Sequence, residues 1–570
     1  MSPRPVGNAP ARLAPYNLGM RYALIFVAAI IPAVARAQGP SCSALKSEVT
    51  IGPLSGHRID SVLVETASPK LGRLARLVGK MHVRTRPDVI RRELLFAPGD
   101  TVDTLRVAES LRRLRKLPFL EYAGVEASAC PGQSGESLVL DIVTRDAWTA
   151  RPDIKASRRS PRIGLTERSL FGTGRAASLE LVSRDRKLGV GITAFDPFGF
   201  GTGVMTRAEY QRYSDGSIVG LSLARRKSSV TDRWTGELDL YDQRNEPRSP
   251  LADNFERAGG EAIGGVRITP TGGSHAVYLL AGVESEYSSL VAAPNADIVG
   301  PVRVDRRFTG PQIGLSILSA RYDTLTWLLS GGAVVDVPRT FEGEIVVGLG
   351  SGAVTVRDFS GSADITSTAN FMTHYDGWVG REWLPTRSSR IVTDLWASGY
   401  SRAGEWQSSR LRAAIAAEHA ASNGLWRLTI AQEQLNDPDP DVRALGIYDR
   451  ALAFVPSRIR LAESALSVSI ERTRHIRSVG TSLELDGSLF GALSKRWDPS
   501  PNSSSGGDFT VGVAGVGLSL SPRRPGRGTV RLDYGFPLTG TPGIKRTPGF
   551  SLTIFPWLES SRHREKSGLF

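Results

Sequence analysis

From about residue 149 to residue 557 the chain repeats one pattern, short stretches that are apolar at every second residue and are separated by Gly, Pro, Asn or Asp. Leu238 and Leu240 alternate with acidic residues, and Val530 and Leu532 alternate with charged ones. Successive side chains of a β-strand point to opposite faces, so each stretch has one apolar and one polar face. The pattern therefore predicts a mainly β fold built from two-faced sheet.

The first 37 residues are predicted to be an export signal. Met20, the expected true start, opens a short basic region, and residues 22–35 form an apolar core. Residues 35–37 (ARA) have the small-x-small form of a signal-peptidase site, which places the mature N-terminus at Gln38. A retained membrane anchor is the alternative, although the apolar run is shorter than the ~20 residues of a spanning helix.

No later apolar run approaches the length of a membrane helix. In lipid the alternative to helices is a closed barrel, because every backbone N–H and C=O must be paired within the protein. Barrel strands of about 9–11 residues alternate between lipid and lumen, and the stretches here have that length. Residues 148–557 are thus predicted to form a transmembrane antiparallel β-barrel with a polar lumen.

Residues 57–147, called the front domain below, have a different pattern. Residues 58–65 are predicted to form a strand, and helices are expected around 71–80, from Pro87 to the break at Gly99, and over 105–117. Two further strands are expected at 122–127 and 137–144, which gives a small α+β domain. Residues 38–56 are assigned to a mature N-terminal segment and residues 558–570 to a charged tail.

Residues 89–100 (VIRRELLFAPGD) and 111–119 (LRRLRKLPF) resemble the polypeptide-transport-associated (POTRA) domain. That resemblance implies capture of unfolded client chains by strand addition at a sheet edge. A plain periplasmic α+β domain is the alternative. The basic run of residues 112–116 is interpreted as a solvated helix face.

Four barrel segments resemble, in order, motifs of BamA/TamA-type outer-membrane assembly proteins (the bacterial surface antigen superfamily). They are 167–174 (ERSLFGTG), 195–202 (FDPFGFGT), 531–538 (RLDYGFPL) and 550–557 (FSLTIFPW). The resemblance implies about 16 strands, whereas the alternation alone yields about 18–20 candidates. Some segments between about 245 and 365 are therefore expected to form hairpins in long surface loops.

The stretch nearest to a functional site is residues 441–448 (DVRALGIY), in a long loop over about 434–460. It resembles the superfamily's inward-folded surface loop, whose tip carries an arginine. The resemblance implies that Arg443, with Val442, forms this tip and is held by a carboxylate of the barrel wall. An ordinary exposed loop arginine is the alternative.

The candidate carboxylate partners of the loop arginine are Glu484 and Asp486. This sequence departs from the motif because Ala444 replaces the glycine that follows the arginine, and Gly446 comes two residues later. Only glycine adopts positive φ without cost, so the tip geometry is expected to differ.

The two cysteines, Cys42 and Cys130, can form a disulfide in an exported protein, or remain thiols. The seven histidines are scattered along the chain, so neither a metal site nor a cofactor is expected. Nucleophile elbows, His-Glu-x-x-His, phosphate loops and paired catalytic carboxylates are all missing from the sequence, which argues against an enzyme. The net charge of +14 suits contact with anionic headgroups, and nucleic acid is not an expected partner of an exported chain.

The leading hypothesis is an outer-membrane protein insertion or assembly factor, with its barrel in the outer membrane and its front domain in the periplasm. The resemblance implies unfolded outer-membrane proteins as clients, lipid contact, and periplasmic accessory proteins or chaperones as further partners. It also implies a seam between the first strand (about 149–157) and the last (about 548–557), onto which a client strand adds. The alternatives are a polypeptide translocation pore of the two-partner secretion type, and a passive porin or structural barrel.

Overall fold

The computed structural model describes most of the chain between residues 54 and 555. The described ranges are 54–68, 83–132, 135–147, 149–155, 162–184, 187–199, 203–212, 216–225, 232–244, 252–270, 273–292, 302–319, 321–326, 334–358, 365–386, 388–402, 405–421, 424–436, 464–479, 483–497, 509–522, 529–539 and 548–555. Within these ranges every helix is too short or too polar to cross a membrane. The predicted export signal, the helix expected around 71–80 and the tail 558–570 lie outside them.

The front domain packs helices on one face of a three-stranded sheet. Its described elements are β1 (Ile59–Ala67), α2 (Pro87–Arg91), α3 (Thr104–Lys116), β2 (Leu120–Gly132) and β3 (Gly135–Asp146), with the sheet order β1-β3-β2. The carboxylate of Asp103 caps α3 by accepting from the backbone N–H of Leu105 at 2.9 Å. The helix predicted from Pro87 to the break at Gly99 is shorter than expected, because α2 ends at Arg91. Gly99, at φ 96°, lies in the turns that follow it.

The core of the front domain lies between the helices and the sheet. Ile90, Leu114, Phe119 and Ile142 are fully buried there. Apolar residues recur at every third position from Leu105 to Leu117, and this spacing predicts helix α3 correctly. It does not predict the whole buried face of α3, because Leu105 is 60 % exposed and Val107 is buried instead.

The opposite face of this sheet is acidic at its centre. Asp141 of β3 lies beside Glu65 of β1 and Glu126 of β2, and its Oδ1 atom has no hydrogen-bond partner among the described residues. Burial, with repulsion from Glu65 and Glu126, raises the pKa of Asp141 to about 6. The carboxyl therefore favours its neutral form in the folded domain.

We expect Asp141→Asn to stabilise the front domain at about pH 7 by roughly 1 kcal/mol, after allowance for solvent screening. The pKa of Asp141 is higher in the folded domain than the ordinary value of 3.8. Its contribution to folding stability is therefore fully present below about pH 4, where the carboxyl is protonated, and is lost as the pH rises through about 6. The gain from the amide should therefore vanish near pH 4. Hydrogen exchange of the β3 amides in the full-length protein measures it, with the exposed Asp88→Asn as control. Equal protection of Asp141→Asn and wild type at both pH values would contradict the prediction.

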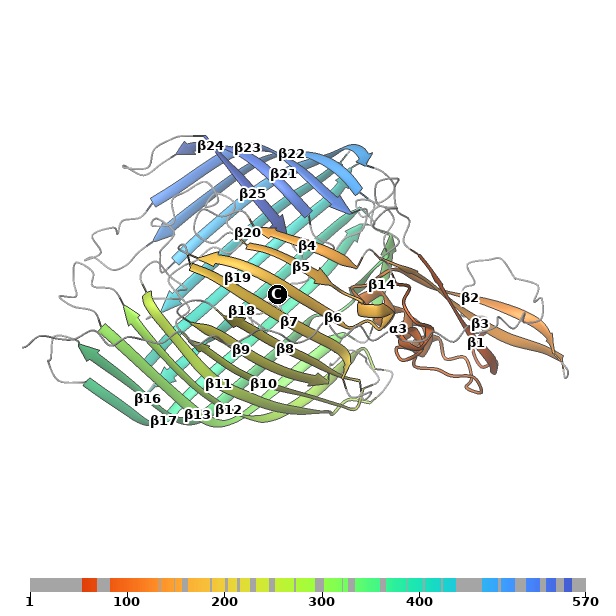
Figure 1. Ribbon diagram of the computed structural model, residues 1–570, viewed down its shortest axis with the longest axis horizontal. Helices are drawn as coiled ribbons and strands as arrows, with labels where there is room; N and C mark the ends of the chain where they lie inside the picture. The colour runs from red at the N-terminus through yellow and green to blue at the C-terminus, as the bar shows by residue number, and fades with distance from the viewer. Residues whose placement is uncertain are drawn as a thin grey trace, which may run out of the picture.

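The large sheet is a barrel whose strand order returns on itself (Figure 1). Its first half consists of β4 (Ala150–Lys155), β5 (Arg162–Glu167), β6 (Ala176–Arg184), β7 (Lys187–Gly199), β8 (Val204–Arg212), β9 (Ser217–Arg225), β10 (Trp234–Arg244), β11 (Ala252–Arg267), β12 (His275–Ala292) and β13 (Val302–Ser319). Its second half consists of β16 (Glu342–Asp358), β17 (Ile365–Thr386), β18 (Ser389–Arg402), β19 (Glu405–Ala421), β20 (Gly424–Asn436), β21 (Ser464–Val479), β22 (Leu483–Trp497), β23 (Phe509–Pro522), β24 (Thr529–Thr539) and β25 (Gly549–Phe555).

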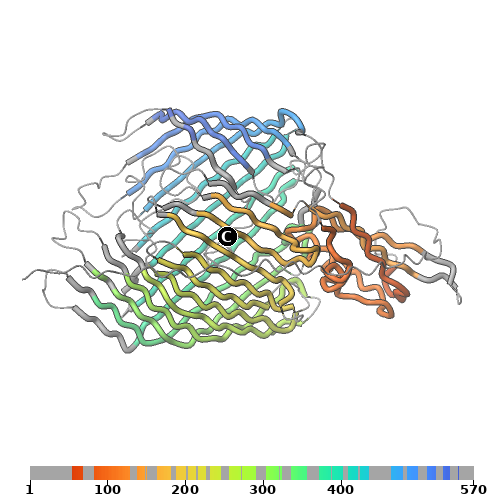
Figure 2. The backbone as a smooth tube through the Cα atoms, viewed as in Figure 1, coloured from red at the N-terminus to blue at the C-terminus, as the bar shows by residue number. Residues whose placement is uncertain are grey.

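All the registers that join these neighbours are antiparallel, and the strands run obliquely across the barrel (Figure 2). The front domain lies at one end of the barrel, where the connections β17–β18 and β19–β20 are short (Figure 1). We call this the turn end.

The alternation of the sequence maps onto an outer and an inner face. Leu240, Ile470 and Leu532 are 44–51 % exposed on the outside, whereas Glu471 and Asp533 on the inner face are 9 % and 5 % exposed. An apolar outer belt around a polar interior is the arrangement of a barrel that spans a lipid bilayer. The predicted mainly β fold, a transmembrane barrel behind a small α+β domain, is confirmed.

The expected number of about 16 strands is too low, because the described order contains twenty. Between residues 252 and 358 the strands β11, β12, β13 and β16 are 16–18 residues long and belong to the barrel wall. One hairpin in this region, β14 (Tyr322–Thr326) with β15 (Val334–Pro338), forms a separate two-stranded sheet. It lies against the front domain at the turn end, not in a long surface loop as expected.

Candidate functional site

The barrel closes between its first and last strands, β4 and β25, which meet on the near side of Figure 1. They are six and seven residues long, whereas β17 has 22 residues. β25 and β4 are hydrogen-bonded neighbours in the closed strand order, and their junction is called the seam below. Shorter strands form fewer backbone hydrogen bonds, so we expect the seam to be weaker than the junctions between long strands.

Pro152 lies in the middle of β4, opposite Leu165 of β5. A proline has no backbone N–H, so β4 lacks one ladder donor at this position. The corresponding proline near the end of the chain, Pro556, lies outside the described residues.

A row of alternating acidic and basic side chains crosses the inner face of the wall toward the seam. It runs from β17 to β24 and consists of Glu382, Arg390, Glu418, Arg427, Glu471, Arg531 and Asp533. Arg427 Nη2 lies 2.6 Å from Glu418 Oε1, and Arg390 Nη1 lies 3.7 Å from Glu418 Oε2. Directly opposed positions in neighbouring strands bring these charges together.

Arg531 links the β24 end of this row to Glu471 of β21 across two intervening strands. Its Nη1 lies 2.7 Å from Glu471 Oε1 of β21, and its Nε donates to Asp533 Oδ1 at 2.8 Å. Its Nη2 also donates to the hydroxyl of Ser488 in β22 at 2.6 Å. The Arg531 side chain is 12 % exposed, so these ion pairs are largely removed from water.

Gly517 of β23 provides the space through which Arg531 passes. A Cβ atom at this position would lie 2.2 Å from Asp533 Oδ1, 2.6 Å from Ser488 Oγ and 3.0 Å from Arg531 Nη2. A methyl group would therefore displace the ion pair that crosses β23.

We expect Gly517→Ala to destabilise the barrel by about 1–3 kcal/mol through this overpacking. Gly491→Ala is the matched control, because the nearest atom to a Cβ there is 3.8 Å away. The heat-dependent gel mobility of the folded barrel measures both variants. Identical thermal midpoints for Gly517→Ala and Gly491→Ala would show that the Arg531 side chain can pass β23 without the space left by Gly517.

A second polar cluster lines the other half of the wall. Arg257 Nη2 donates to Glu286 Oε2 at 2.7 Å, and the hydroxyl of Tyr241 donates to the same oxygen at 3.2 Å. His374 Nδ1 lies 2.7 Å from Glu284 Oε2. Buried charges on both halves of the wall are thus held by partners on other strands, some of them not adjacent in the strand order.

The loop-arginine prediction falls between Asn436 of β20 and Ser464 of β21. Val442, Arg443, Ala444 and Gly446 all lie outside the described residues. The anchoring of Arg443 therefore stays a prediction.

The two candidate partners of Arg443 lie together on β22, at the turn end. The carboxylates of Glu484 and Asp486 share the inner face of that strand, and Asp486 Oδ1 is 3.1 Å from His475 Nδ1 of β21. Sequence reasoning missed His475 because its proximity depends on the β21–β22 register. The disulfide prediction stays untested because Cys42 and the side chain of Cys130 lie outside the described residues.

The barrel motifs near the front domain support its attachment. The turn after β5 contains Gly172, whose carbonyl accepts from the backbone N–H of Arg86 at 3.0 Å. Arg175, the residue after the first motif, donates through Nε to Asp196 Oδ2 of the second motif at 2.9 Å. Phe198 of the second motif is buried in the front-domain core.

Helix α3 also contacts the β14–β15 hairpin. Arg115 Nη1 lies 2.9 Å from Asp336 Oδ1, and the guanidinium of Arg112 lies 4.7 Å from the centre of the Tyr322 ring. Burial alone lowers the pKa of Arg112, but its hydrogen bonds to Glu109 outweigh this and raise the pKa above its ordinary value. The prediction of a solvated basic face is therefore wrong for Arg112 and Arg115, and also for Arg113, which pairs with Glu93 at 2.8 Å.

Comparisons with known proteins agree with the sequence motifs. No protein-family profile matches the chain. Over 134 residues, 23 % of this chain, it is 27 % identical to the outer membrane protein assembly factor BamA of Neorickettsia risticii (strain Illinois). The chain is similar to BamA/TamA-type proteins. The matched stretch spans 18 % of that relative's length.

Solved structures of barrel proteins align with most of the chain at low identity. BamA from Haemophilus ducreyi lacking POTRA domains 1–3 is 12 % identical, with a TM-score of 0.34 over 88 % of this chain and 85 % of that one. CdiB from Escherichia coli is 11 % identical, with a TM-score of 0.39 over 89 % of this chain and 78 % of that one. The fold assignment rests on the strand order of this chain, not on these alignments.

Proposed function

We propose that the protein is an outer-membrane protein insertion or assembly factor. Its barrel would span the outer membrane, its front domain would face the periplasm, and its clients would be unfolded outer-membrane proteins. The protein would have no catalytic activity. It would contact outer-membrane lipid and act together with periplasmic accessory proteins or chaperones.

The observation that carries the proposal is the contrast between the seam and the rest of the wall. From β17 to β24 the inner face is cross-linked by the charged row, which ends one strand before β25. The two seam strands are short, and β4 carries Pro152 in its middle. A client strand that adds to an exposed backbone ladder requires such an opening, because a fully paired barrel has no free edge.

The docked front domain supports the same function. A passive pore needs no α+β domain packed against its turn end, whereas a protein that receives client polypeptides needs a surface beside the seam. The front domain leads directly into β4, so a client bound there would be close to the first seam strand.

Depletion of the protein in its host, with quantification of the outer-membrane proteome, tests the proposal. General loss of outer-membrane proteins supports assembly. Loss of one secreted partner alone would indicate a translocation pore instead, and altered solute permeability alone would indicate a porin. A photo-crosslinker placed at Asp153 in β4 should capture nascent barrel proteins, whereas one on the outer face of β12 at Leu279 should not.

A further inference from the structure

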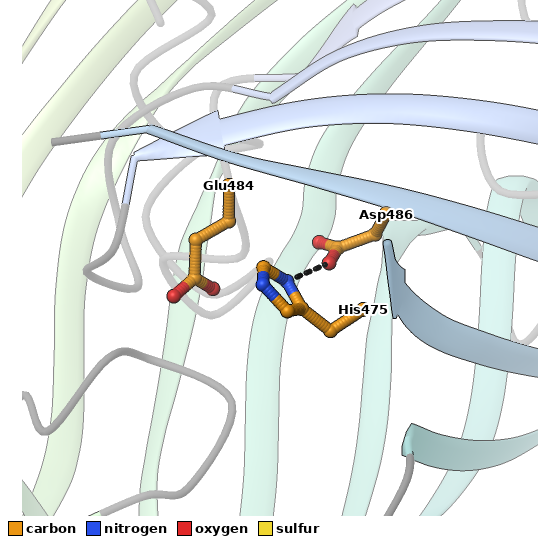
Figure 3. A group of neighbouring side chains, drawn as sticks. All are labelled: His475, Glu484 and Asp486. Atoms are coloured by element: carbon orange, nitrogen blue, oxygen red, sulfur yellow. Dashed lines mark hydrogen bonds and ion pairs between the residues drawn. The ribbon is translucent and has the colours of Figure 1, made fainter. Parts of the chain in front are cut away.

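Three potential metal ligands meet on the inner face of the barrel at the turn end. His475 of β21 stands directly opposite Asp486 of β22, and Glu484 lies two residues before Asp486 on the same face. One ligand atom from each residue lies within 4.8 Å of the other two. Figure 3 shows the imidazole between the two carboxylates, with its Nδ1 directed at Asp486.

An irregularity of the ladder lies at this position. The β21–β22 register shifts between His475 and Arg477, so that Ser478 rather than Arg477 faces the Glu484 position. The extra residue, Ile476, is 53 % exposed. Bulges interrupt the backbone pairing locally and redirect neighbouring side chains, and they are over-represented beside functional sites. The side chains of His475 and Asp486 are 47 % and 18 % exposed, so an ion from solvent can reach them.

We propose that His475, Glu484 and Asp486 bind one divalent transition-metal ion of the Zn²⁺ class. A nitrogen ligand with two carboxylates suits Zn²⁺, whereas Mg²⁺ and Ca²⁺ prefer sites built from oxygen alone. Two carboxylates also balance the charge of the ion. Three protein ligands leave one position of a tetrahedral site for water.

Metal binding would replace the hydrogen bond between His475 and Asp486 by bonds to the ion. Protons compete with the ion for these ligands, so metal affinity should fall at low pH. The bound ion would join β21 to β22 at the point where the register shift interrupts their ladder. The expectation of no metal site rested on histidines scattered in sequence, which does not exclude ligands supplied by a neighbouring strand.

The test uses the full-length protein in detergent after chelator treatment. Zn²⁺ retained after desalting should amount to about one equivalent per chain, and Co²⁺ should give visible absorption that Zn²⁺ removes. His475→Ala, Glu484→Gln and Asp486→Asn should each weaken binding by about tenfold or more, since even outer-shell changes cost about 10–100-fold. His419→Ala is the matched control, because His419 lies at the same barrel end and its Nδ1 is 2.9 Å from the Ser389 hydroxyl.

A second measurement separates metal binding from folding. Without metal, the near-isosteric Asp486→Asn should keep the gel mobility of the folded barrel, and Zn²⁺ should raise the thermal midpoint of wild type but not of this variant. Absence of retained Zn²⁺ in folded wild type would overturn the proposal, as would equal retention by all three ligand variants. The outcome is independent of the assembly function.

Discussion

Arg531→Ala should destabilise the barrel by about 3–5 kcal/mol, the range expected when one partner of a buried ion pair is removed. Arg531 holds Glu471 at 2.7 Å and Asp533 at 2.8 Å, and the two acidic side chains are only 11 % and 7 % exposed. Without the guanidinium, Asp533 loses this ion pair, and Glu471 loses its contact with Arg531 while Arg427 stays opposite it. The repulsion and desolvation of the two carboxylates then act together.

The midpoint of heat-dependent gel mobility and urea unfolding in detergent measure this loss. Arg244→Ala is the matched control, because Arg244 and Asp242 form an exposed pair with side chains 66 % and 40 % exposed. Such pairs contribute about 0–1 kcal/mol. A combined Arg531→Met, Glu471→Gln and Asp533→Asn variant should recover much of the loss, because no unpaired charge remains. Equal effects of Arg531→Ala and Arg244→Ala would exclude a structural role for the charged row.

The second large effect is expected at the seam. A disulfide between β4 and β25 should abolish assembly of client proteins in cells, and a reductant should restore it. A scan of cysteine pairs at positions 150–155 and 549–555 would find the pairs that cross-link.

The control for the disulfide between β4 and β25 is a disulfide between β24 and β25, two strands paired in a known register. Leu532 and Leu552 face each other in β24 and β25, so a cysteine pair there locks two strands that should stay together. Assembly should continue in this variant. If it also continues at full rate with the seam locked, client strands do not enter through the seam.

Side-chain alternation was sufficient to predict the two-faced barrel, because successive residues of a strand point alternately inward and outward. The strand number was harder, since a long strand with scattered glycines such as β16 resembles a loop hairpin in sequence. Gly348, Gly350 and Gly352 all lie within β16, as strand glycines rather than a phosphate loop.

The charged row could not be predicted from sequence because it depends on register across several strands. Arg531 and Asp533 were visible as an i, i+2 pair on one face of a strand, but Glu471 lies 60 positions earlier and reaches Arg531 only across β22 and β23. The same limit applies to Arg112 and Arg115. A helical charge run indicates a solvated face until another element, here β14–β15, covers it.

The strand order shows that helix α3 contacts the barrel on the side opposite the seam. From β4 to β13 there are ten strands, and from β16 to β25 another ten, so the β14–β15 hairpin is inserted diametrically opposite the seam. The front domain is joined to β4 by the polypeptide itself and to the far side of the barrel through Arg112 and Arg115. It spans the mouth of the barrel as a brace attached on both sides, on the seam side also through Gly172 and Phe198. Any widening of the seam changes the distance between the two sides, and so either bends the domain or breaks the Arg115–Asp336 contact.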